Sequence, residues 1–181
     1  MTKKVAIIIP ALNEEESIAD VIDNVLEVGY QNPEYNLFLE IIDGRSSDRT
    51  VEIAREKGAN VIVQKGKGKG VGIRQTIDLC FPKNVVNRTL SLACGNCDQV
   101  QEISSLLDTN YIIMLDADGT YPPKYIPDII DALESGEDVV MGSRFKGTIE
   151  EGAMTGMNRI GNKILSALAA LLYSHKCSDI C

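Results

Sequence analysis

Short apolar runs alternate along this chain with segments whose apolar residues recur at helical spacing, and this alternation strongly narrows the possible folds. The first run, residues 4–9, is rich in β-branched residues and precedes a helical pattern formed by Ile18, Val21, Ile22, Val25 and Leu26. Further strands are predicted at 37–42, 60–63, 111–115 and 138–141. Further helices are predicted from a Ser47-Asp48 cap to Lys57, and at 73–79, 124–134 and 158–173. This order predicts an α/β fold with a mostly parallel sheet between two helical layers.

Composition favours a single domain that comprises residues 1–181, because 44% of the residues are hydrophobic and the chain is long enough to bury a core. Residues 81–109 interrupt the alternation and are predicted to be an insertion. The five cysteines are expected to be reduced thiols. Four of them allow the alternative of a structural zinc site, namely Cys94, Cys97, Cys177 and Cys181.

The formal net charge of -8 argues against nucleic-acid binding, because such binding needs a basic face. The only dense basic stretch is residues 65–74, in which glycines alternate with Lys65, Lys67 and Lys69. Glycines let backbone amides approach an anion, so we expect a diphosphate pocket here, with a solvated flexible loop as the alternative. The stretch matches neither G-x-x-x-x-G-K-[ST] nor G-x-G-x-x-G, which disfavours a P-loop ATPase and a dinucleotide-binding fold.

Asp116-Ala117-Asp118 directly follows the apolar run 111–115. A buried parallel strand would therefore deliver two carboxylates to the loop at its carboxyl end. Oxygen ligands of this kind hold Mg2+ or Mn2+ against a substrate diphosphate. The alternative is that these carboxylates only cap a turn or a helix.

Two more polar clusters follow predicted strands, at residues 10–14 and 43–48. In a parallel sheet the carboxyl ends of the strands form the ligand-binding edge, so the three clusters are expected to converge. Asp43 is suited to accept from a nucleobase N–H, and Asn13 and Glu14 to bind base or ribose hydroxyls. The alternative is that both clusters cap helices, and this alternative is favoured for Glu15, Glu16 and Asp48.

In order and spacing, five sequence blocks resemble the family 2 glycosyltransferases with the GT-A fold, in particular the dolichyl-phosphate mannose or glucose synthase branch. The blocks are 7–15, 42–50, 67–70 with Arg74, 115–118 and 142–145. The resemblance implies catalytic roles for Asp116, Asp118 and Arg144, and metal binding by the two aspartates. It implies substrate binding by Pro10, Ala11, Leu12, Asn13, Glu14, Asp43, Lys67, Gly68, Arg74 and Ala117. The chain departs from relatives at Arg45 and Arg49, where glycine is frequent, and at Thr120, where some have a metal-binding Gln.

The resemblance further implies an inverting, metal-dependent transfer of a hexose from a UDP- or GDP-sugar to dolichyl or polyprenyl phosphate. Alternatives are a soluble acceptor such as a saccharide, or a non-catalytic nucleotide-sugar-binding remnant. Related chains continue beyond Cys181, so a truncated C-terminus is expected. No apolar stretch suits a signal peptide or a spanning helix, and we expect a cytoplasmic protein at the cytoplasmic face of the membrane. The apolar stripe of helix 158–173 suits peripheral membrane contact or, alternatively, packing on the sheet.

Overall fold

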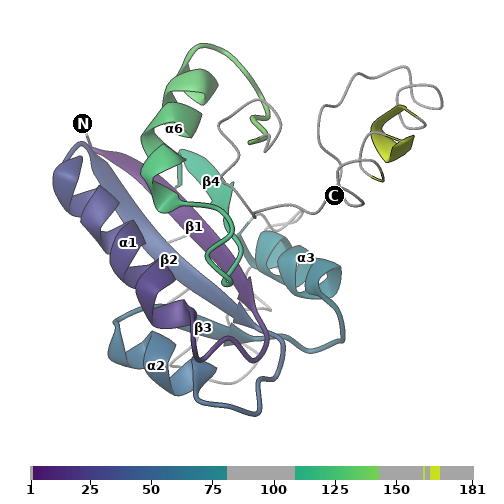
Figure 1. Cartoon of the computed structure of the whole chain (residues 1–181). Helices are drawn as coiled ribbons and strands as arrows, with labels where there is room; N and C mark the ends of the chain where they lie inside the picture. The colour runs from purple at the N-terminus through teal and green to yellow at the C-terminus, as the bar shows by residue number, and fades with distance from the viewer. Residues whose placement is uncertain (1, 81–108, 143–160, 162–163, 168–181) are drawn as a thin grey trace, which may run out of the picture. The chain divides into compact units, whose positions relative to one another are not determined.

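The computed structural model describes residues 2–80, 109–142, 161 and 164–167 (Figure 1). Contacts within the chain define two compact units, Met1–Ile130 and Asp131–Cys181. The strands are β1 Lys3–Ala11, β2 Tyr35–Asp43, β3 Asn60–Val63 and β4 Tyr111–Met114. The helices are α1 Ile18–Gln31, α2 Thr50–Glu56, α3 Lys69–Cys80, the 3-10 turn η2 Pro123–Tyr125 and α6 Ile126–Glu134.

The four strands form one parallel sheet in the order β3-β2-β1-β4. β1 pairs with β2 from Lys3↔Tyr35 to Ala11↔Asp43, and with β4 over Val5–Ile8. The chain therefore extends the sheet to one side of β1 and then crosses to the other side for β4. This change of direction creates a switch point at the carboxyl ends of β1 and β4, where ligands of such sheets bind. The predicted parallel α/β fold is confirmed.

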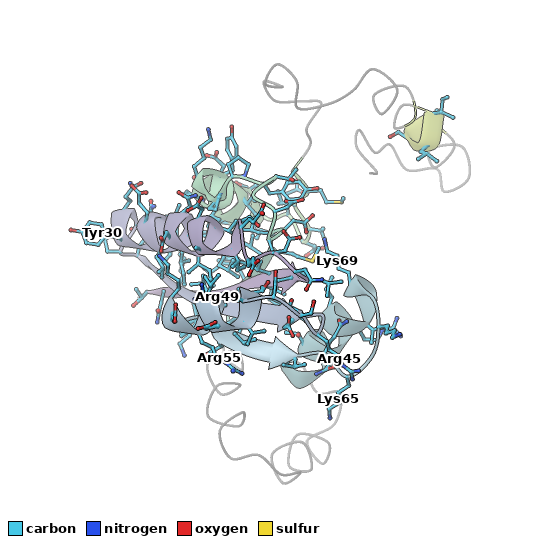
Figure 2. The ribbon with its side chains drawn as sticks, turned by 60° about the horizontal axis from the view of Figure 1, so that its bottom comes forward. Tyr30, Arg45, Arg49, Arg55, Lys65 and Lys69 are labelled. Carbon is cyan, nitrogen blue, oxygen red and sulfur yellow. The ribbon has the colours of Figure 1, made fainter. Side chains whose placement is uncertain are left out.

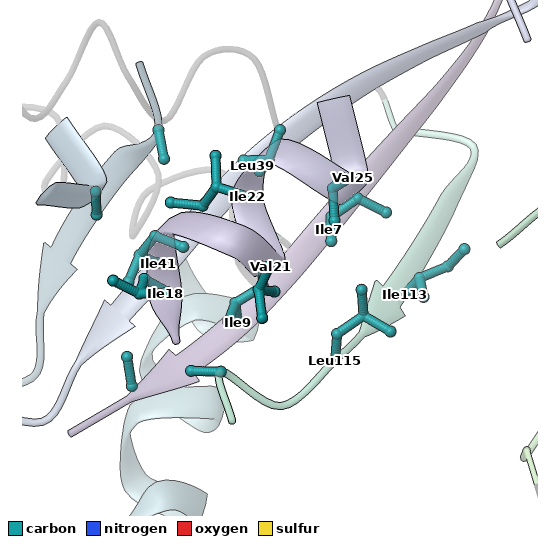
Figure 3. Packing of buried hydrophobic residues seen from close by; sticks show 14 of the residues in the cluster. Ile7, Ile9, Ile18, Val21, Ile22, Val25, Leu39, Ile41, Ile113 and Leu115 are labelled. Carbon is teal, nitrogen blue, oxygen red and sulfur yellow. The ribbon is translucent and has the colours of Figure 1, made fainter. Parts of the chain in front are cut away.

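The main core lies between one face of the sheet and helices α1, α2 and α6. Ile7 and Ile9 of β1 and Ile41 of β2 face the apolar side of α1, as Figure 3 shows. That side of α1 includes four of the five predicted residues, Ile18, Val21, Ile22 and Val25, all at most 3% exposed. The fifth, Leu26, is 46% exposed and does not belong to the core. Burial of each of the four side chains contributes about 1.5–3 kcal/mol, so this face anchors the sheet.

The opposite face of the sheet is met by α3, which thus completes the predicted arrangement of helices on both faces (Figure 1). Ile8 and Ile42 point to this face and are each 2% exposed. Gly72 of α3 lies so close that an added Cβ would be 2.8 Å from Ile42 Cγ2. The absence of a side chain at Gly72 therefore sets the distance between α3 and β2.

The predicted strand at residues 138–141 is wrong. This segment has no strand pairing, and Val139 and Met141 are 74% and 70% exposed. A run of three apolar residues is too short to form a strand without a neighbouring strand to supply hydrogen bonds.

Three helix starts also differ from the sequence predictions. α2 begins at Thr50 with Arg49 as the N-cap position, rather than being capped by Ser47 and Asp48 as the sequence suggested. α3 begins at Lys69, four residues before the predicted start. The sequence prediction missed this first turn because it is rich in glycine and shows no apolar periodicity. The last helix of the first unit begins as a 3-10 turn at Pro123 and continues as α6 from Ile126.

Several sequence predictions lie wholly or mainly outside the described residues. These are the insertion at 81–109, the zinc alternative and most of the helix at 158–173. Residues 161 and 164–167 of the last segment are helical, as predicted. Within the described part of the chain, no helix combines the length and apolar character needed to span a membrane.

Candidate functional site

A pocket of about 600 Å³ lies at the carboxyl ends of the strands, at the switch point between β1 and β4. It brings together most of the predicted site residues: Pro10, Ala11, Leu12, Glu14, Lys67, Gly68, Asp116, Ala117 and Asp118. It is also lined by residues that were not among the predicted site residues: Ile42, Gly44, Arg45, Gln64 and Lys69. The convergence of the three polar clusters predicted from the sequence is confirmed for these residues.

Two carboxylates enter the pocket just beyond β4. The backbone N–H of Leu115 donates to the Ile8 carbonyl at 3.1 Å, which continues the alignment with β1 past the end of the strand. Ala117 is only 2% exposed and packs in the core, whereas Asp116 and Asp118 line the pocket. The buried alanine therefore anchors the segment that carries both acids.

Asp118 is held in its ionised form. Its Oδ1 accepts from the Thr120 backbone N–H at 2.9 Å, in a turn completed by Gly119 at φ 75°. Partial burial raises the pKa of Asp118, but hydrogen bonds from Thr120 and the charge of Lys69 outweigh burial and leave that pKa below its ordinary value. The carboxylate is thus available to a cation over the whole neutral range.

The basic loop lies across the pocket from the acids. Gly68 has φ 94°, and its carbonyl accepts from the N–H groups of Val71 and Gly72 in the first turn of α3. Lys69, the first residue of that helix, forms an ion pair with Asp116. Lysines and a helix N-terminus therefore lie beside the Asp pair in the structure, an arrangement that suits an anionic ligand.

Arg45 connects two loops at the pocket edge. Its guanidinium donates to the carbonyls of Gln64 at 3.4 Å and Lys65 at 3.0 Å. Figure 2 shows Arg45 beside Lys65. The Arg45 backbone has φ 71°, a left-handed conformation that normally favours glycine. The only sequence signal for this role was an arginine in a position where relatives often have glycine.

Asp43 shapes the same loop from inside. It is 2% exposed, and its two carboxylate oxygens accept from the backbone N–H groups of Arg45 and Ser46, each at 3.0 Å. Asp43 is not among the residues that line the pocket. Its predicted contact with a nucleobase remains a prediction, and its observed bonds stabilise the loop conformation.

The loops that follow β1 and β2 are joined by reciprocal hydrogen bonds. Asn13 accepts from the Ser47 N–H at 2.8 Å through its side chain, and its own N–H donates to Ser46 Oγ at 3.0 Å. The N–H of Glu14 donates to Thr50 Oγ1 at 2.8 Å. Asn13 thus connects the two loops at the pocket rim but does not itself line the pocket, and its role toward a base or ribose remains a prediction.

Glu15 and Asp48 form a second reciprocal pair between the same two loops. The Glu15 N–H donates to Asp48 at 3.1 Å, and Glu15 accepts from the Arg49 N–H at 3.0 Å. Thr50 also donates its hydroxyl to Asp48. Glu15 and Asp48 therefore have a structural role, but they join two loops and do not cap a helix as predicted, because the N-cap positions of α1 and α2 are Ser17 and Arg49.

Besides Asn13 and Asp43, two more predicted residues are not brought into this pocket by the described structure. Arg74 is exposed on α3 and does not line the pocket. Arg144 lies outside the described residues, so its predicted role has no structural description.

Asp116 and Asp118 suit a hard divalent cation, but they would be an incomplete shell. No group of three or more His, Cys, Asp or Glu side chains suited to a metal occurs among the described residues. Mg2+ characteristically binds one or two carboxylates and takes its other ligands from water and substrate phosphates. The two acids beside a basic loop fit this mode of binding.

Comparison with known proteins is consistent with this arrangement. The model of the family "Glycosyl transferase family 2" matches residues 6–86 and 99–180. Glycosyltransferase AglJ of Haloferax volcanii is 35% identical over 97% of this chain and 47% of its own length. A dolichyl-phosphate hexose transferase of the same organism is 31% identical over 92% of this chain and 58% of its own length. The chain thus spans about half the length of these relatives.

A solved structure supports the fold. Glucosyl-3-phosphoglycerate synthase of Mycobacterium tuberculosis, in complex with Mn2+, UDP-glucose and phosphoglyceric acid, aligns with a TM-score of 0.58 at 19% identity. The alignment covers 95% of this chain and 51% of that one. At this identity the likeness concerns the fold, and the ligands named are those of the mycobacterial protein.

Proposed function

This chain belongs to glycosyl transferase family 2, and on that premise we propose that it is an inverting glycosyltransferase that moves a hexose from a nucleotide-sugar to dolichyl or polyprenyl phosphate. The single observation that carries the proposal is the pocket in which Asp116 and Asp118 face the Lys67–Lys69 loop. Paired acids and a basic glycine-rich loop at a strand-order switch point suit a cation and a diphosphate. The donor is a UDP- or GDP-sugar.

The acceptor assignment draws on relatives. Similar proteins carry the names dolichyl-phosphate hexose transferase in Haloferax volcanii and dolichol-phosphate mannosyltransferase in Pyrococcus furiosus. An acceptor with a long lipid tail requires peripheral contact with a membrane surface, which we propose takes place at its cytoplasmic face. Ile164 and Leu165 of the second unit are 56% and 46% exposed and offer apolar side chains of the required kind.

We assign donor positioning to the residues around the pocket. Leu12 and Glu14 follow β1, and Gly44 follows β2, so these residues are available to the nucleoside part of the donor. Asp43 and Asn13 keep that wall in shape through the hydrogen bonds described above. Ordered walls reduce the entropy that the donor loses when its reacting bond is aligned with the acceptor.

Charge stabilisation is the main chemical task of the pocket. As the bond between the anomeric carbon and the diphosphate breaks, negative charge grows on the leaving nucleoside diphosphate. Lys67 and Lys69 lie where they can stabilise this charge. Bound Mg2+ or Mn2+, held by Asp116 and Asp118, would supply Lewis-acid stabilisation of the same oxygens.

The acceptor phosphate is already anionic and needs no strong general base. It attacks the anomeric carbon from the face opposite the leaving group, which inverts the configuration. Arg144, which lies outside the described residues, is proposed to orient the acceptor phosphate by its positive charge.

The proposal is tested by calorimetric titration of the chain with UDP-glucose, UDP-N-acetylglucosamine and GDP-mannose, with and without Mn2+. We expect one donor to bind, and to bind more tightly with Mn2+. Asp118→Ala should abolish the Mn2+ effect, whereas Glu56→Ala, which removes an exposed carboxylate of α2 outside the pocket, should preserve it. Transfer from that donor to a polyprenyl phosphate is then measured. Unchanged Mn2+-dependent binding and transfer in Asp118→Ala would refute the site assignment.

A further inference from the structure

Lys69 and Asp116 form an ion pair that solvent can reach. Their side chains are 50% and 28% exposed, and both line the pocket. Lys69 extends from the first position of α3, directly after Gly68 with its positive φ of 94°. The pair is therefore positioned by the turn at the start of the helix and is not locked inside the core.

The ammonium group of Lys69 is paired with the Asp116 carboxylate, which a divalent cation would need as a ligand. Its charge also acts on Asp118, where it contributes to the lowered pKa. With the ion pair closed, one of the two aspartates in the pocket is neutralised. A cation that binds Asp116 through Oδ1, the oxygen that pairs with Lys69, must therefore displace the ammonium.

We propose that Lys69 is an exchangeable counter-ion, which holds Asp116 when no cation is bound and transfers to the donor diphosphate when the cation takes that carboxylate. This inference rests on the proposed function. The displaced ammonium remains on the basic loop, beside Lys67 and at the N-terminus of α3, where an anion is favoured.

The exchange couples the binding of the cation to the binding of the donor diphosphate. A cation alone must break the ion pair without compensation, whereas a cation together with a diphosphate offers Lys69 a new partner. Binding of each ligand therefore favours binding of the other, and the coupling must be reciprocal. Lys69 weakens binding of the free cation and strengthens binding of the nucleotide in the presence of the cation.

The test measures these two affinities separately in Lys69→Met. Mn2+ binding without nucleotide is followed by electron paramagnetic resonance of the free ion. Because exposed ion pairs are weak, we expect Mn2+ to bind about two- to five-fold more tightly to Lys69→Met than to the wild-type chain. Calorimetry at saturating Mn2+ should show weaker binding of whichever nucleotide, UDP or GDP, the wild-type chain binds.

Lys65→Met is the matched control, because it removes the same charge from the same loop at an exposed position that does not line the pocket. It should change Mn2+ affinity less than Lys69→Met. Lys69→Arg, which retains the charge, should behave like the wild-type chain. In an Asp116→Asn background, Lys69→Met should tighten Mn2+ binding less than it does in the wild-type chain, because the contested carboxylate is gone and only the effect of Lys69 on Asp118 remains.

The opposite signs of the two effects distinguish an exchange from a loss of structure, since a misfolded pocket would bind both ligands more weakly. Mn2+ binding to Lys69→Met that is unchanged or weaker would overturn the inference, while wild-type binding of Mn2+ and nucleotide would leave the proposed function standing. If the wild-type chain bound none of Mn2+, UDP and GDP, both the inference and the proposed function would be overturned.

Discussion

Two glycines in the first turn of α3 should respond in opposite ways to replacement by alanine. An added Cβ at Gly72 would lie 2.4 Å from Gln64 Oε1 and 2.8 Å from Ile42 Cγ2, and both of those residues are buried. An added Cβ at Gly70 would meet nothing within 4 Å. The two substitutions are chemically identical and lie in the same helix, so their difference isolates the contact with β2.

The magnitudes follow from two opposing effects. Alanine stabilises a helix over glycine by about 0.5–1 kcal/mol, and this gain applies in full only inside the helix. Overpacking a tight contact costs about 1–3 kcal/mol. Gly72→Ala should therefore lower the free energy of unfolding by about 1–2 kcal/mol, or the melting temperature by about 2–8 °C for a chain of this size. Gly70→Ala should leave the melting temperature unchanged or raise it by up to about 4 °C.

Thermal unfolding followed by circular dichroism measures both variants under the same conditions. Nucleotide titration then shows whether the displaced α3 also disturbs the basic loop at its start, which we expect for Gly72→Ala alone. Equal melting temperatures for the two variants, or a more stable Gly72→Ala, would show that α3 does not pack on β2 at the distance described.

Three further predictions concern the loops around the pocket. The Thr120 side chain, besides its backbone N–H, donates a hydrogen bond that lowers the pKa of Asp118. Thr120→Val removes this hydroxyl and should raise the pKa of Asp118 toward its ordinary value; a carbon-13 NMR titration of the carboxyl group measures this. The wild-type carboxylate should thus remain ionised as pH falls to that ordinary value and become protonated only below it, and Mn2+ binding should weaken in the same window. Arg45→Ala should speed amide hydrogen exchange in residues 64–70, because two bonds to that loop are lost. Thr50→Val should lower the free energy of unfolding by about 1–3 kcal/mol in urea titrations, because the Glu14 N–H loses its acceptor.

Each of these has a result that would contradict it. An unchanged or lower pKa of Asp118 in Thr120→Val would show that the Thr120 hydroxyl does not stabilise the Asp118 carboxylate. For Arg45→Ala the control is Arg55→Ala, an exposed arginine of α2 that does not line the pocket, and equal exchange rates in the two would refute the loop contact. For Thr50→Val, stability equal to the wild type would mean that the two loops are not joined through this hydroxyl.

Much of the fold could be predicted because burial leaves a periodic trace in the sequence. The β-branched run of β1 and the helical spacing of Ile18, Val21, Ile22 and Val25 both correspond to buried positions. The strand prediction at 138–141 failed because a run of three apolar residues is too short to show a period. The early start of α3 was missed because glycines leave no apolar pattern, although the backbone there is helical.

The candidate site could be predicted in its chemical content but not in its internal contacts. The acids at 116 and 118 and the lysines at 67 and 69 are visible as residue types at strand ends and in a glycine-rich loop. That Asp43 is buried and bonded to its own loop, or that Arg45 reaches the 64–65 carbonyls, depends on backbone conformations that residue types do not specify.

The sequence by itself determined the order of strands and helices up to residue 134, the parallel sheet and the gathering of polar clusters at one sheet edge, because these follow from local periodicity and from the geometry of parallel strands. Only the tertiary structure decided which charges face each other. Lys69 and Asp116 are 47 positions apart, and their ion pair depends on how closely α3 approaches the sheet and where β4 joins β1. Such distances are set by the packing of helices and strands against each other, and the sequence of one segment alone does not specify them.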